Sequence, residues 1–132
     1  MNTKIVMTAS AIILGLTGII LTFMPMELLH YINFETSKSA QVLIQILGAL
    51  YFSFAMLNWM TKTTIIGGIY NRPIAVANFT HFTVAGLALI KGLLSSPGLQ
   101  NTAWIIAIIY AIFALSFGII LFRHPLSETN PK

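Results

Sequence analysis

Polar side chains inside long apolar stretches are the residues of this sequence best placed to do chemistry. His81 and Asn78 are three residues apart, which puts them on one face of a helix. An ionisable group in so apolar a helix is costly to bury and is a functional candidate for that reason. The helical rise places Tyr51 at the depth of His81, and Tyr110 and Ser116 bracket that depth. We therefore predict a ligand site formed by His81, Asn78, Tyr51, Gln45 and Tyr110.

The same residues also have a purely structural interpretation. A neutral His81 that hydrogen-bonds to Tyr51 or Asn78 would hold helices together, at about 0.6 kcal/mol per bond. A metal site is not expected, because His30 and His124 lie at opposite ends of the predicted bundle and the chain has no cysteine. No nucleophile–base pair or carboxylate pair is visible, so we predict no catalytic residue.

A second polar group is predicted near the outer ends of the apolar stretches. Gln41 and Gln45 share one face of the second stretch. Lys91, near the end of the third stretch, could form an ion pair with Glu27 or Glu35. Alternatively, its ammonium could extend to the lipid headgroups. We predict Glu27, Lys91 and Gln41 as an outer-rim polar group.

The connection over residues 61–73 is unusually apolar for a turn. Gly67 and Gly68 could form a backbone nest for a phosphate, flanked by Lys62 and Arg72. The favoured alternative is a hairpin that packs its apolar side chains into the headgroup region.

The composition predicts what must position these residues. Hydrophobic residues make up 57% of the 132 residues and charged residues 8%, against about 25% charged in a typical soluble domain. A helix needs about 20 mostly apolar residues to cross a bilayer. The four stretches that meet this requirement are residues 5–24, 39–61, 73–94 and 102–122. We predict one all-α membrane domain over residues 1–132, a bundle of four transmembrane helices.

The first stretch could instead be a secretory signal peptide. Its apolar run is longer than that of a usual signal peptide, and the only charge before it is Lys4. We therefore expect a retained helix.

The basic residues predict the orientation of the chain. Lysine and arginine are enriched in cytoplasmic loops. This rule places both termini on the cytoplasmic side of a bacterial inner membrane. The net charge of +4 is spread along the chain without a basic cluster, so no nucleic-acid partner is expected. The cytoplasmic side would hold Lys4, Lys62, Arg72, Arg123 and Lys132, and the outer side Lys38 and Lys91.

Small residues recur at helical spacing in every apolar stretch. Apolar burial does not drive helices together in lipid, whereas close backbone approach at small residues does. We predict that these stripes pack against other helices, within or between protomers. They comprise Ala11, Gly15, Gly18 and Thr22; Gly48 and Ala55; Ala85, Ala88 and Gly92; and Ala103, Ala107, Ala111, Ala114 and Gly118.

Several of these features form a wider pattern: Gly15 and Gly18 in a first helix that ends at Pro25, the run LGALY over residues 47–51, a short basic connection, and His81 in the third helix. In this pattern most of the chain resembles the DoxX-like group of small bacterial four-helix membrane proteins. Some members of that group resemble membrane subunits of quinone-linked oxidoreductases, and many have no known activity, so the resemblance implies such a subunit as one expectation. Direct sulfur chemistry is not expected without cysteine. The embedded glutamate of small multidrug transporters and the Gly-Gly-Thr-Thr-Phe break of fluoride channels are not found in this sequence.

Together these observations favour a binding or scaffold protein that holds a lipid, a quinone or a partner subunit against the face formed by His81, Asn78 and Tyr51. The alternative is a homo-oligomeric transporter or channel for a small solute or protons. A membrane enzyme has the least support, because the three acidic residues lie outside the apolar stretches.

Overall fold

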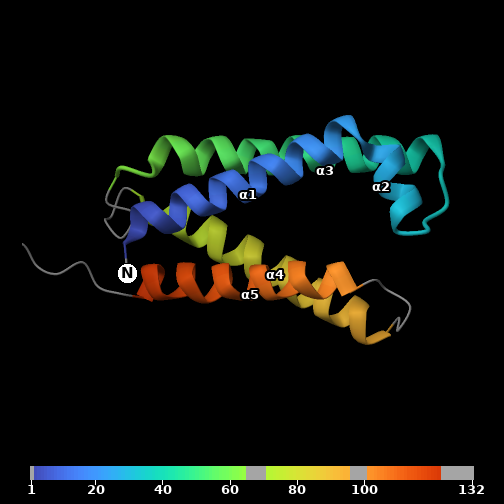
Figure 1. The fold of residues 1–132 in the computed structure, drawn as a ribbon. Helices are drawn as coiled ribbons and strands as arrows, with labels where there is room; N and C mark the ends of the chain where they lie inside the picture. The colour runs from blue at the N-terminus through green and yellow to red at the C-terminus, as the bar shows by residue number, and fades with distance from the viewer. Residues whose placement is uncertain (1, 65–70, 96–100, 123–132) are drawn as a thin grey trace, which may run out of the picture. The chain divides into compact units, whose positions relative to one another are not determined.

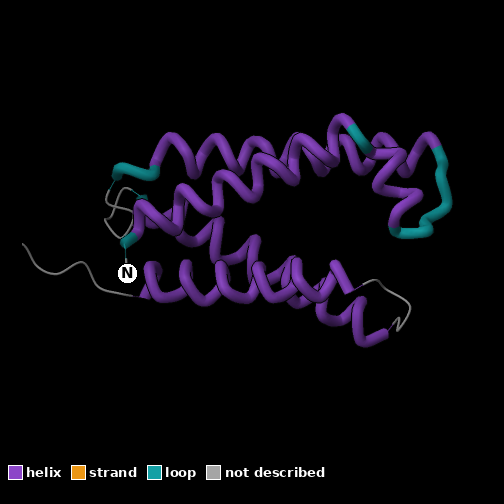
Figure 2. Tube along the Cα trace, viewed as in Figure 1, coloured by secondary structure: helices purple, strands orange, loops and turns teal. Residues whose placement is uncertain are grey.

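A computed structural model describes residues 2–64, 71–95 and 101–122 of the chain. Within these ranges the chain forms five helices and no strand (Figures 1 and 2). They are α1 (Thr3–Phe23), α2 (Pro25–Tyr31), α3 (Lys38–Thr61), α4 (Arg72–Ser95) and α5 (Asn101–Phe122). Four of the described helices, all except α2, are long and apolar enough to cross a membrane. The predicted all-α class and the four long helices are confirmed.

Local signals in the sequence explain where these helices begin and end. The Asn2 side chain accepts a hydrogen bond from the Lys4 backbone N–H at 3.1 Å, and the Ser37 hydroxyl accepts one from the Ala40 N–H at 3.1 Å. Such caps satisfy N–H groups that the first turn of a helix leaves without a backbone partner. Pro25 separates α1 from α2, because it has no N–H to continue the first helix and its fixed φ suits the start of the second.

The chain divides into two compact units. The first contains α1, α2 and α3, and the second contains α4 and α5. The predicted four-helix bundle would join the two units, and it stays a prediction. The connection that contains Gly67 and Gly68, expected to form an interfacial hairpin or else a phosphate nest, lies outside the described residues.

In the first unit, α1 and α3 run side by side (Figure 1) and pack through small residues. A Cβ atom placed on Gly18 would lie 2.7 Å from the Phe52 backbone nitrogen and 2.9 Å from the Gly48 carbonyl oxygen. One placed on Gly15 would lie 3.5 Å from the Cβ of Ala55. The small residues predicted in the first two stretches therefore do lie where two backbones meet.

In the second unit, α4 and α5 pack mainly through aromatic rings. Phe82 of α4 is fully buried, and its ring centroid lies 4.8 Å from that of Phe113 and 5.7 Å from that of Phe117. The predicted small-residue stripes form only part of this interface: Ala107 is buried and a Cβ atom on Gly118 would lie 3.2 Å from the Phe79 ring, whereas Ala88 and Ala111 are exposed. The small residues that do lie in the interface make room for the large rings of the facing helix, as Gly86 does for Tyr110.

Candidate functional site

Three aromatic side chains meet in the middle of the α4–α5 pair. The His81 ring centroid lies 5.2 Å from that of Phe82 and 5.9 Å from that of Tyr110. Phe82 and Tyr110 are 5.2 Å apart in an edge-to-face arrangement. His81 is half-buried, and its Nε2 atom is shielded from solvent. A polar imidazole is thus held against two rings within an apolar helix.

Asn78 lies one helical turn before His81 and is completely buried. Its side-chain amide donates a hydrogen bond to the Ile74 carbonyl oxygen at 3.0 Å. This bond to its own helix fixes the amide beside the turn that carries His81. We call Asn78, His81, Phe82 and Tyr110 the His81 cluster. Of its four members, sequence reasoning predicted all but Phe82.

The other two predicted ligand residues lie on α3, in the first unit. Gln45 donates a hydrogen bond from its side-chain amide to the Thr22 carbonyl oxygen at 3.3 Å, across the α1–α3 interface. Tyr51 is half-buried. The structure thus gives Gln45 a role in packing α1 against α3. The predicted meeting of Tyr51 and Gln45 with His81 stays a prediction.

The outer-rim residues are also divided between the units. Glu27 lies in the first turn of α2, the short helix that follows Pro25, and is exposed. Gln41 is half-buried on α3, one turn before Gln45. Lys91 is exposed on α4, in the second unit. The two alternatives for Lys91, extension to the headgroups or an ion pair with Glu27 or Glu35, stay open.

A buried polar pair between α1 and α3 was not predicted. Asn58 and Ser10 are both fully buried, and the Asn58 amide donates a hydrogen bond to the Ser10 hydroxyl at 3.0 Å. The antiparallel register that pairs Gly15 with Ala55 also brings Ser10 close to Asn58. The two small-residue stripes would have revealed this pair if they had been aligned with each other.

A lysine–tryptophan contact at the end of α3 was also not predicted. The Lys62 ammonium nitrogen lies 3.0 Å from the centroid of the Trp59 ring. A cation over an aromatic face is attracted by the negative face of the ring. The two residues are three apart at a helix end, and that spacing is the sequence signal that could have found the contact.

Among the described residues, no group of three His, Cys, Asp or Glu side chains is placed to hold a metal ion. Comparison of the chain with protein-family models, with curated proteins and with solved structures found no match. The resemblance to the DoxX-like group therefore stays a prediction. The case for a function rests on the geometry of the His81 cluster and on the apolar surfaces of the long helices.

Proposed function

We propose that this chain is a membrane-embedded binding protein, with its four long helices crossing a bacterial inner membrane and both termini in the cytoplasm. The exposed surfaces of these helices support insertion. Leu43, Met60 and Leu115 are 67%, 72% and 70% exposed. In water, continuous apolar faces of this kind favour aggregation, whereas in a bilayer they match the lipid tails. The distribution of lysine and arginine supports the orientation.

The proposed binding site is the His81 cluster, and the contact of His81 with Tyr110 and Phe82 is the observation that carries it. Aromatic rings offer flat apolar surface to a planar headgroup or an acyl chain. An imidazole can donate or accept a hydrogen bond with a carbonyl or hydroxyl group. This pairing of properties suits a lipid or a quinone. The helix of a partner subunit with a polar side chain at this depth is the third ligand that fits.

The test compares two histidine substitutions in the full-length protein. His81→Gln removes the imidazole from the cluster, and the matched control His30→Gln removes an exposed imidazole from α2. Each variant is purified from bacterial membranes, extracted with organic solvent, and analysed by mass spectrometry for co-purified quinone and lipid. We expect His81→Gln to lower the retained amount of one such molecule about tenfold, because the glutamine amide cannot place its donor and acceptor where the ring nitrogens lie and the ligand loses about one hydrogen bond.

A melting temperature measured in detergent separates binding from structural support. Glutamine preserves much of the hydrogen-bonding capacity of histidine, so we expect the melting temperature of His81→Gln to stay close to that of the parent. A fall in stability that accounts for the lost ligand would assign His81 a structural role. Full retention of the same molecules by both variants would remove His81 from the site.

A further inference from the structure

An open apolar groove lies between α1 and α3 in the first unit. Its volume is about 260 Å³. Gly15 and Ala55 are too small to fill it, while Phe52 and Met56 flank it with half-exposed side chains. The groove is smaller than the roughly 300–1,000 Å³ of pockets that enclose a compact ligand. Its small volume and apolar lining suit a single hydrocarbon chain, and the lining is completed by Ala11, Ile12 and Trp59.

A positive charge is held at one end of this groove. Trp59 forms that end, and the Lys62 ammonium lies 3.0 Å from the centroid of its ring. The ring face holds the cation in place without using all three of its N–H donors. Tryptophan favours the level of the headgroups in a bilayer, and a lysine one turn beyond it reaches the phosphates.

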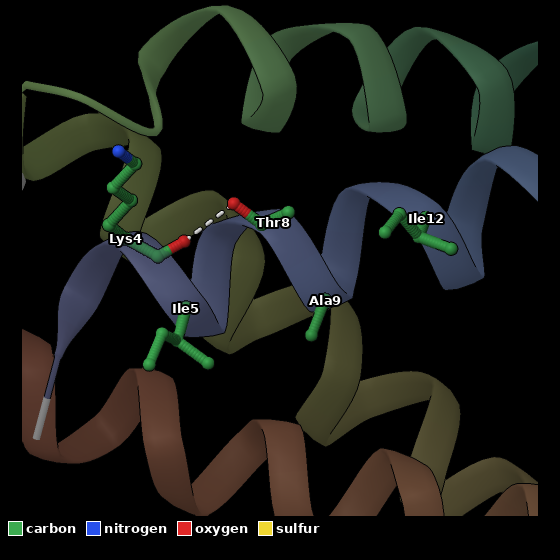
Figure 3. A pocket seen from close by; sticks show the side chains of 5 residues that line it. All are labelled: Lys4, Ile5, Thr8, Ala9 and Ile12. Atoms are coloured by element: carbon green, nitrogen blue, oxygen red, sulfur yellow. Dashed lines mark hydrogen bonds between the residues drawn. The ribbon is translucent and has the colours of Figure 1, made fainter.

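A second lysine lies at the same end of the α1–α3 pair. Contacts of Ser10 with Asn58 and of Gly18 with Gly48 show that the two helices are antiparallel, so the first turn of α1 lies beside the last turn of α3. Lys4 lines another hollow, of about 330 Å³, that shares Ile12 with the groove. Figure 3 shows Lys4 and Thr8 projecting to one side of α1, with the Thr8 hydroxyl bonded to the Lys4 carbonyl oxygen.

The acidic residues of this unit lie at the opposite end. Glu27 is in α2, and Glu35 is in the connection between α2 and α3. The groove therefore combines an apolar lining with a positive end that lies at the opposite end of the unit from the described carboxylates. This arrangement is complementary to an amphiphile with a negative head.

We propose that the groove binds an anionic phospholipid, with one acyl chain lying along the outside of the α1–α3 seam and the phosphate against the Lys62 ammonium. A zwitterionic lipid would occupy the same groove, but its headgroup would be attracted less strongly by the Lys62 ammonium. One basic residue at a membrane surface corresponds to about a fivefold preference for anionic lipid. The inference rests on the proposed membrane insertion and not on the His81 cluster.

The test uses the fluorescence of Trp59 in the full-length protein. The chain has two tryptophans, so Trp104→Phe leaves Trp59 as the only emitter. The Trp104→Phe variant serves as the parent and is reconstituted into vesicles of unbrominated phosphatidylcholine. A small fraction of brominated lipid is added, either phosphatidylglycerol or phosphatidylcholine, with the bromine on the acyl chains. Bromine quenches a tryptophan that it contacts. We expect brominated phosphatidylglycerol to quench Trp59 with about a fivefold higher apparent affinity.

Two lysine variants of the parent complete the test. We expect Lys62→Gln to abolish the preference for phosphatidylglycerol. Lys38→Gln, which removes an equal charge from the other end of α3, should keep it. Equal quenching of the parent by both lipids, or an unchanged preference in Lys62→Gln, would overturn the proposal. His81→Gln should leave Trp59 quenching unchanged, so failure of the His81 site would be seen separately. Absence of quenching by either lipid would instead refute membrane insertion.

Discussion

Single residues set how closely α1 and α3 can approach, and Gly48 tests this directly. A Cβ atom on Gly48 would lie 2.8 Å from the Thr22 backbone nitrogen and 2.9 Å from the Gly18 carbonyl oxygen. These are backbone atoms, so the helices would have to move apart. We expect Gly48→Ala to lower the free energy of unfolding in detergent by about 1–3 kcal/mol. The better helix propensity of alanine, worth up to about 1 kcal/mol, should offset only part of this loss.

Gly92 on α4 provides the matched control. A Cβ atom there would meet no other atom within 4 Å. Gly92→Ala should therefore leave stability unchanged or raise it slightly through helix propensity. If the two variants unfold at the same denaturant concentration, close backbone contact is not what holds α1 against α3.

Some candidate functional residues can be identified from a single helix, whereas others depend on how two helices are aligned. Asn78, His81 and Tyr110 were found because each is polar within an apolar stretch, a property of a single helix. The Ser10–Asn58 bond was missed because it depends on the register between two helices. Hydroxyl side chains in apolar helices usually bond to a carbonyl of their own helix, as Thr17 does at 2.8 Å. The hydroxyl alone therefore does not mark Ser10, and the alignment of α1 with α3 is needed to show that it has a partner on another helix.

At the scale of the helix, the packing depends on which face each helix turns towards its neighbour. Two alanines on α5 test which face of that helix packs against α4. Ala107 is 2% exposed, whereas Ala111, one turn further along, is exposed. We expect Ala107→Leu to lower stability by about 1–3 kcal/mol, because the enlarged side chain would have to push α4 and α5 apart. Ala111→Leu should be nearly silent. Thermal unfolding in detergent measures both, and a larger loss for Ala111→Leu would contradict the packing described for this pair.

Helix boundaries were predictable because length, proline and charge mark them in the sequence. Helix faces were predictable only in part. The small residues of α1 and α3 correctly indicated their interface, because glycine lets two backbones meet. On α5 the apolar residues run all the way round, so hydrophobicity does not distinguish the packed face from the others. On α5 the packed face is the one that carries Phe113 and Phe117, because their rings stack against Phe82 of α4.

At the scale of the whole molecule, the orientation in the membrane can be tested at the two ends of α3. Thr36 precedes this helix, Thr63 follows it, and both are exposed. The helix has 24 residues, which at about 1.5 Å per residue is enough to cross a hydrocarbon core of about 30 Å. The two positions must therefore lie on opposite sides if α3 spans the bilayer.

The chain has no cysteine, so Thr36→Cys and Thr63→Cys each introduce a single reactive thiol. The lysine and arginine distribution places the Thr63 end, next to Lys62, in the cytoplasm. We expect a membrane-impermeant maleimide to label Thr36→Cys in intact cells, and to label Thr63→Cys only after the membrane is permeabilised. The reverse pattern would invert the orientation while preserving the span. Labelling of both positions in intact cells would show that α3 does not cross the membrane, and because both flank one helix, this outcome does not depend on how the two units are arranged.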